Sequence, residues 1–318
     1  MERASRQHRI SCENASRRAQ RVTVLWTQRI DFPDDVSTNS QRTLRVVGVD
    51  FTSAPSPRKP IVVAHGVWAE DSLTICSIDR LFAFAAFDAL LASPGPWIGA
   101  FDLPFGLPRE LVVTLNWPIR WCDLVAHVES IGKGQFKDAL NRIRESRPMG
   151  ARYIPRSGDA AAGSSSPMKL VNPPVGLMFF EGAPRIARSG VSVIPCMPSD
   201  DSRVALEAYP GFLARKFTTA SYKKDGPAGQ SAARQSNREV IVDGFSRASA
   251  ATAGLTVALP GALRQMCVDD GSGDALDAVL CAVQAAMALR AHLSGDRCYG
   301  IPKNADPIEG WIATVLAS

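Results

Sequence analysis

The chain has 318 residues, of which 46% are hydrophobic, so it can bury the core of one large domain or of two ordinary ones. A formal net charge of +5 permits an anionic partner without requiring one. The seven cysteines include no Cys-x-x-Cys pair, and their number is odd. This pattern indicates reduced thiols in a cytoplasmic protein and argues against a disulfide framework or a zinc site.

The N-terminal residues 1–43 show no sustained hydrophobic period and are rich in arginine, so we expect a disordered extension there and one domain over residues 44–318. They also lack the apolar stretch of a secretory signal. The most apolar helix we expect, over residues 275–293, is interrupted by polar side chains and is typical of a core helix. We therefore expect no association with a membrane.

The domain is expected to begin with strands. The run LRVVGVDFTSAP (44–55) predicts a buried strand that ends at Asp50 and opens into a loop. Residues 60–69 and 72–78 predict two further strands, and their short connections favour an antiparallel meander. A helix is expected over residues 79–93, where the apolar positions fit a helical period.

A second acid ends the next strand, since the apolar run WIGAFDLPFGLP (97–108) contains Asp102 just before its prolines. Residues 117–200 are rich in Arg, Pro, Gly and Ser, and we expect an irregular insertion of loops and short helices there. Residues 202–215 predict a strand up to Glu207, followed by a Tyr-Pro turn and the start of a helix.

The expected core helix starts from a glycine-rich turn, and Asp274 and Asp277 lie in its first turn. Either acid alone is explained by helix capping or by the helix dipole. Acids three residues apart, however, share one face of a helix. Both could therefore project toward the ends of the strands.

Three predicted strands end in a carboxylate, and the open edge of an α/β sheet is where sites form. Clustered carboxylates repel one another, and burying them without a counter-charge is costly. Carboxylate oxygens without His or Cys suit Mg²⁺ or Mn²⁺. The sequence therefore predicts a Mg²⁺ or Mn²⁺ site formed by these acids.

Six short blocks resemble, in order, those of the DUF429 family, which is grouped with the ribonuclease H-like fold and described as predicted nucleases. The resemblance covers roughly residues 44–315 and omits the region 117–200. It implies a ribonuclease H-like α/β fold, with a mixed sheet flanked by helices and interrupted by the insertion. The blocks are GVDFTS, GAFDLPFGLP, EAYPGFLAR, YKKDGPAGQSAARQ, GDALDAVLCA and EGWI.

The resemblance also implies roles for the five acids. Asp50 matches the acid of the first strand and Asp102 that of the fourth, while Asp274 and Asp277 match a pair on the last helix. Glu207 matches the Glu-x-Tyr-Pro block. All five become candidates for catalysis, and all but Glu207 for metal binding. The implied reaction is phosphodiester hydrolysis in DNA or RNA by two ions about 4 Å apart, with Asp274 acting as a ligand or as a general base.

Two basic stretches are candidates for holding the polyanion, although a solvated surface explains any single residue equally. Lys223, Lys224 and Arg234 lie in one of the family blocks, close to the aromatic residues Phe217 and Tyr222. The remaining candidates are Arg142, Arg144, Arg147, Arg152, Arg156 and Arg238.

Other functions stay open. The stretch DGSGDALDAVL resembles the Gly-Ala-Gly-Asp signature of ribokinase-type sugar kinases, in which glycines form an anion hole and Asp274 would be the catalytic base. An actin-like phosphotransferase using ATP is a related alternative. A non-catalytic nucleic-acid-binding scaffold of the same fold is a third. The sequence does not predict the oligomeric state.

Overall fold

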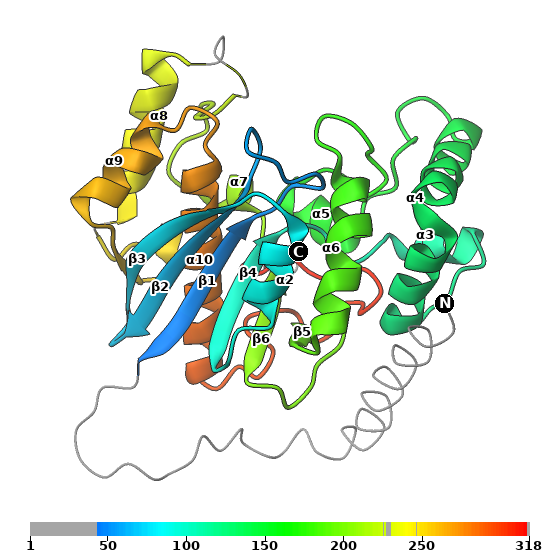
Figure 1. Ribbon diagram of the computed structural model, residues 1–318, viewed down its shortest axis with the longest axis horizontal. Coiled ribbons are helices and arrows are strands. Elements are labelled where there is room, and N and C mark those ends of the chain that lie inside the picture. The colour runs from blue at the N-terminus through cyan, green and yellow to red at the C-terminus, as the bar shows by residue number, and fades with distance from the viewer. Residues whose placement is uncertain (1–42, 225, 227–229, 246, 317–318) are drawn as a thin grey trace.

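A mixed β-sheet lies between two layers of helices in the computed structural model (Figure 1). The α/β fold with a mixed sheet flanked by helices, predicted from the sequence, is confirmed. Of the N-terminal extension predicted for residues 1–43, only Thr43 belongs to the described part of the chain. The structure describes residues 43–224, 226, 230–245 and 247–316.

The sheet has seven strands within the described residues, in the order β5-β6-β4-β1-β2-β3-β7. β1, β2 and β3 form the antiparallel meander that the short connections predicted. β4 pairs parallel to β1, β6 pairs parallel to β4 and β5, and β7 pairs parallel to β3. The strands are β1 Leu44–Asp50, β2 Ile61–Ala69, β3 Ser72–Leu81, β4 Trp97–Asp102, β5 Ser192–Ile194, β6 Arg203–Glu207 and β7 Thr256–Ala258.

Two hydrophobic clusters hold the helices on the sheet. Side chains of α7, α8, α9 and α10 fill one face, and side chains of α2, α3, α4 and α6 fill the other. A single turn of 3-10 helix, Ala250–Thr252, precedes β7. The α-helices are α2 Phe84–Leu91, α3 Arg109–Thr114, α4 Trp121–Ser146, α5 Ser157–Ala162, α6 Val175–Ser189, α7 Pro210–Ala214, α8 Ala232–Phe245, α9 Gly261–Asp269 and α10 Asp274–Leu293.

α10 is the central helix of its layer and crosses β1, β2 and β4. Fifteen of its twenty residues are buried, and they include Asp277 and Gln284. It is the one described helix whose length and composition would let it cross a membrane, and 78% of its most apolar window is buried inside the protein. The apolar surface of α10 is thus covered by the sheet and the neighbouring helices.

The segment 117–200 contains the predicted loops and one short helix, α5, but it also contains two long helices and a strand that were not predicted. It contains α4, with 26 residues and a break at Gly132, as well as the 15-residue α6 and the strand β5. α4 buries Leu124, Val128 and Phe136 while its charged residues face outward. The Arg-rich composition concealed this helical period.

The helix expected over residues 79–93 begins later than predicted. Asp79, Arg80 and Leu81 continue β3 and pair with β2, and α2 starts only at Phe84. The apolar residues near this junction fit either period, and pairing with β2 decides in favour of the strand.

Candidate functional site

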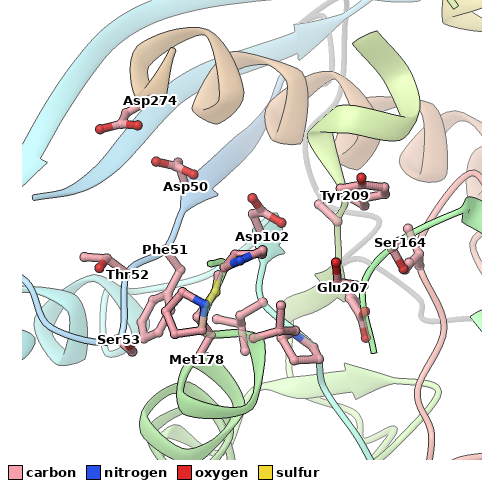
Figure 2. A pocket seen from close by; sticks show the side chains of 18 of the residues that line it. Asp50, Phe51, Thr52, Ser53, Asp102, Ser164, Met178, Glu207, Tyr209 and Asp274 are labelled. Atoms are coloured by element: carbon pink, nitrogen blue, oxygen red, sulfur yellow. The ribbon is translucent and has the colours of Figure 1, made fainter. Parts of the chain in front are cut away.

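Asp50 and Asp102 end two neighbouring parallel strands, β1 and β4, and the strand register pairs them directly. Paired residues of parallel strands project from the same face of the sheet, and successive residues alternate between faces. Val49 and Phe101, one residue earlier, belong to the cluster under α2 and α6. Asp50 and Asp102 therefore point to the side of the sheet that α10 covers (Figure 2).

α10 contributes a third acid because it lies in direct contact with β1. A Cβ atom at Gly48 would lie 2.1 Å from the Ala278 carbonyl oxygen and the Ala282 nitrogen, so only glycine permits this approach. Asp277 is fully buried beside the strand ends. One carboxylate oxygen each from Asp50, Asp102 and Asp277 lies within 4.8 Å of the others. We call these three residues the acid triad.

Both carboxylate oxygens of Asp277 have partners. The Tyr222 hydroxyl donates to Oδ1 at 2.6 Å, and the Lys223 ammonium donates to Oδ2. Asp277 is fully buried, whereas 41% of the Lys223 side chain is exposed. Lys223, predicted to bind substrate phosphate, is therefore a counter-charge of the acid triad.

Burial and mutual repulsion shape the charge of the triad. Burial, and then the charges of Asp277 and Asp274, raise the pKa of Asp50 well above its usual value. Burial raises the pKa of Asp102 to about 7, although the Lys223 ammonium opposes the shift. The pKa of Lys223 is lowered by burial, but the acids around it, chiefly Asp277, raise it well above its usual value. One ammonium does not offset three acids, so the triad attracts protons or a further cation.

Asp274 lies at the first position of α10 and is half-buried at the rim of the same cleft. It lies outside the acid triad. It is not the helix cap either, because Asp270 accepts hydrogen bonds from the Ala275 N–H at 2.9 Å and from the Ser272 N–H at 3.1 Å. Asp270 was not singled out from the sequence, although an Asp two residues before a serine is a common turn motif.

A ribokinase-like enzyme would need an anion hole formed by the glycine turn at the start of α10. The Asp270 carboxylate already accepts hydrogen bonds from two backbone N–H groups of this turn, those of Ser272 and Ala275. A Cβ at Gly271 would meet the Gln230 side chain, and one at Gly273 would meet Lys223. The space over the glycine turn is therefore filled by this chain's own side chains.

Glu207 lies on the other face of the sheet. It pairs with Phe101 rather than with Asp102, and the alternation of side chains turns it away from α10. Its carboxylate accepts hydrogen bonds from the buried Arg156 guanidinium, and Oδ1 and Oδ2 of Asp159 accept from the same group. The structure thus places Glu207 in a buried ion-pair network, separate from the acid triad.

Two predicted phosphate-binding residues are buried and make internal bonds instead. Arg156 is 2% exposed, and Arg238 is equally buried and donates to the carbonyl oxygens of Val268 and Tyr222. Their assignment to a polyanion surface was wrong, because sequence composition does not distinguish a buried arginine from a solvated one.

The other basic candidates are divided between the cleft and the surface. Lys224 lines the cleft, and its backbone N–H donates to the Gly271 carbonyl oxygen. Arg234 lies on α8, with its Nε 3.5 Å from the Ser221 hydroxyl, and does not line the cleft. Arg144 and Arg147 form ion pairs with Glu145 and Glu110. Among the predicted basic residues, Lys223 and Lys224 line the cleft beside the acids, whereas Arg156 lines it as part of the separate Glu207 network.

A cleft of about 740 Å³ opens above the carboxyl ends of β1, β4 and β6 (Figure 2). Its lining includes Asp50, Asp102, Asp274 and three lysines, one of which is Lys59 from the loop between β1 and β2. The start of α6 lines the opposite side with uncharged residues, which include Pro173, Pro174, Val175 and Met178.

Comparison of the chain with protein-family models, with curated proteins and with solved structures finds no match. The resemblance to the DUF429 blocks therefore stays a prediction, and the site is interpreted from its own geometry.

Proposed function

We propose that this protein is a divalent-metal-dependent nuclease with a ribonuclease H-like fold, which hydrolyses phosphodiester bonds in DNA or RNA. The observation that carries the proposal is the acid triad: two in-register strand ends and one buried helix position converge within 4.8 Å. Acids on the first strand, on a parallel neighbouring strand and on the last helix are the arrangement that the DUF429 resemblance implied.

The donor set fits a hard divalent cation. Asp50, Asp102 and Asp277 offer carboxylate oxygens, and no His or Cys belongs to this group among the described residues. Such ligands suit Mg²⁺ or Mn²⁺. A cation bound there would supply Lewis acidity, which activates water and offsets charge on a phosphate.

Other residues of the chain would neutralise the substrate phosphates, accept a proton and orient the acids. Lys224 and Lys59 line the cleft beside the acids and can neutralise substrate phosphates. Asp274 lies at the rim as a candidate general base, and its pKa is raised by burial and then by the charges of Asp270 and Asp277. Tyr222 holds the Asp277 carboxylate in orientation through its 2.6 Å hydrogen bond.

A second candidate is a nucleic-acid-binding module that needs no metal. Lys223 supports it, because this ammonium already neutralises part of the triad's charge. We do not propose the ribokinase-like alternative, because Asp270, Gln230 and Lys223 fill the anion hole that it would require.

The test combines metal binding with cleavage. Mn²⁺ is expected to raise the melting temperature of the wild-type protein by mass action, and the protein is expected to cut single-stranded, duplex, branched or hybrid oligonucleotides in Mn²⁺. Asp102→Asn should lower cleavage by more than about a hundredfold, since even loss of an outer-shell partner of a metal costs ten- to a hundredfold. Asp138→Asn, an exposed acid on α4, is the matched control.

Cleavage that persists in Asp102→Asn would contradict the assignment of the triad. Nucleic-acid binding without a metal-dependent melting shift and without cleavage would favour the second candidate.

A further inference from the structure

The cleft has two sides with different chemistry. Lys223 and Lys224 accompany the acids on one side. On the other side the chain runs through residues 172–178, with the sequence Asn-Pro-Pro-Val-Gly-Leu-Met, which contains no charged residue. We call Pro173, Pro174, Val175 and Met178 the apolar wall; all four line the cleft.

The apolar wall is accessible rather than part of the core. Pro173 is exposed, and Pro174, Val175 and Met178 are half-buried, whereas Phe179, the next residue, is fully buried in the cluster under the sheet. Figure 2 shows the Met178 side chain extending into the cleft, on the same side as Phe51. These side chains therefore offer an uncharged surface to a ligand that also reaches the acids.

We propose that the apolar wall binds an unpaired nucleobase next to the phosphate held at the acid triad, so that the substrate is single-stranded DNA or RNA. The inference rests on the proposed nuclease function. An uncharged, apolar wall does not neutralise the charge of a phosphate, whereas proline, valine and methionine side chains pack well against the flat face of a base. Bases inside a duplex are stacked and paired, and must leave the stack before a pocket can hold them.

The size of the cleft agrees with this substrate. A volume of about 740 Å³ lies within the range of pockets that enclose a small organic ligand, roughly 300–1,000 Å³. A cleft of this volume accommodates a nucleotide.

The closing experiment measures binding in Ca²⁺, separately from cleavage in Mn²⁺. Fluorescence anisotropy would compare a labelled single strand, the same strand with abasic residues in place of its central nucleotides, and the duplex. The single strand is expected to bind about tenfold more tightly than the abasic strand, which is the effect of burying roughly 50 Å² of apolar surface. Met178→Ala should remove most of this difference.

Met149→Ala is the matched control, because Met149 is 87% exposed and does not line the cleft. Val175→Ser provides a second change in the apolar wall should Met178→Ala unfold, which circular dichroism would show. Equal affinity for the base-bearing and abasic strands, or tighter binding of the duplex, would overturn the inference.

The cleavage arm tests the proposed function by itself. If no strand is cut but the base-dependent binding is found and is lost in Met178→Ala, the nuclease fails and the base site stands. If all strands are cut at equal rates in wild type and in Met178→Ala, the nuclease stands and the base site fails.

Discussion

Replacing Lys223 by methionine removes the ammonium that contacts the acid triad while keeping much of the aliphatic stem. The fully buried Asp277 carboxylate then loses the partner of its Oδ2 atom and keeps only the Tyr222 hydroxyl on Oδ1. Removing one partner of a buried ion pair costs about 3–5 kcal/mol. Because 41% of the Lys223 side chain is exposed, solvent screening reduces this to about 1–2 kcal/mol.

For a domain of this size, 1 kcal/mol corresponds to roughly 2–4 °C, so a loss of about 1–2 kcal/mol means that Lys223→Met in EDTA should melt about 2–8 °C below wild type. Mn²⁺ should then stabilise the variant more than wild type, because a cation at the triad no longer competes with the ammonium. At a free concentration of about 100 Kd, mass action contributes about 2.7 kcal/mol.

Differential scanning fluorimetry in EDTA and in a Mn²⁺ series measures both effects. Lys224→Met is the matched control, since it removes the same charge from the adjacent residue of the cleft. Its melting temperature should stay close to wild type, with an unchanged Mn²⁺ response. A Lys223→Met protein that is as stable as wild type, or that responds less to Mn²⁺, would refute the role of Lys223 as counter-charge.

Three further predictions follow from the same geometry. The pKa of Asp102 is raised to about 7 in the folded protein, so its contribution to stability is fully present below about pH 4 and lost as pH rises through 7; unfolding titrations in EDTA should show this loss, and Asp102→Asn should reduce it to the part contributed by Asp50 and the other buried acids. Arg156→Met should lower stability by about 3–5 kcal/mol without changing the Mn²⁺ response, whereas Arg152→Met, exposed in the same segment, should do neither. Gly48→Ala should displace α10 from β1, so a melting scan should show lower stability and a weaker Mn²⁺ shift; a full Mn²⁺ shift would contradict the role of Gly48.

The positions of Asp50, Asp102 and Glu207 at strand ends could be predicted from the sequence, because each follows a short apolar run. The register of the strands could not. Pairing Asp50 with Asp102, but Phe101 with Glu207, depends on hydrogen bonds between segments that are about fifty to a hundred residues apart. A shift of one residue reverses the face of a side chain, and this alone separates Glu207 from the acid triad.

The partners of the charged residues were harder still to predict. Lys223 lies 54 residues before Asp277, and only the folded chain brings its ammonium to that carboxylate. Arg156 and Asp159 are three apart, a spacing that favours contact in a helical turn. The Arg-, Gly- and Ser-rich composition around them predicted loops and short helices, and α5 is such a helix, but the composition gave no sign of the buried ion pair.

The acid triad and the Arg156 network differ in whether a ligand can replace one of their ion-pair partners. A guanidinium has five N–H donors, and Arg156 makes five hydrogen bonds, two to Asp159, two to Glu207 and one to the Glu309 carbonyl oxygen. A ligand could join that network only by breaking a bond buried from water. The Lys223 side chain is half-exposed, and the carboxylates around its ammonium outnumber it. Another cation can therefore replace this ammonium without disrupting the hydrophobic core. That difference favours the α10 face of the sheet for binding a cation, and it indicates a structural role for the Arg156 network.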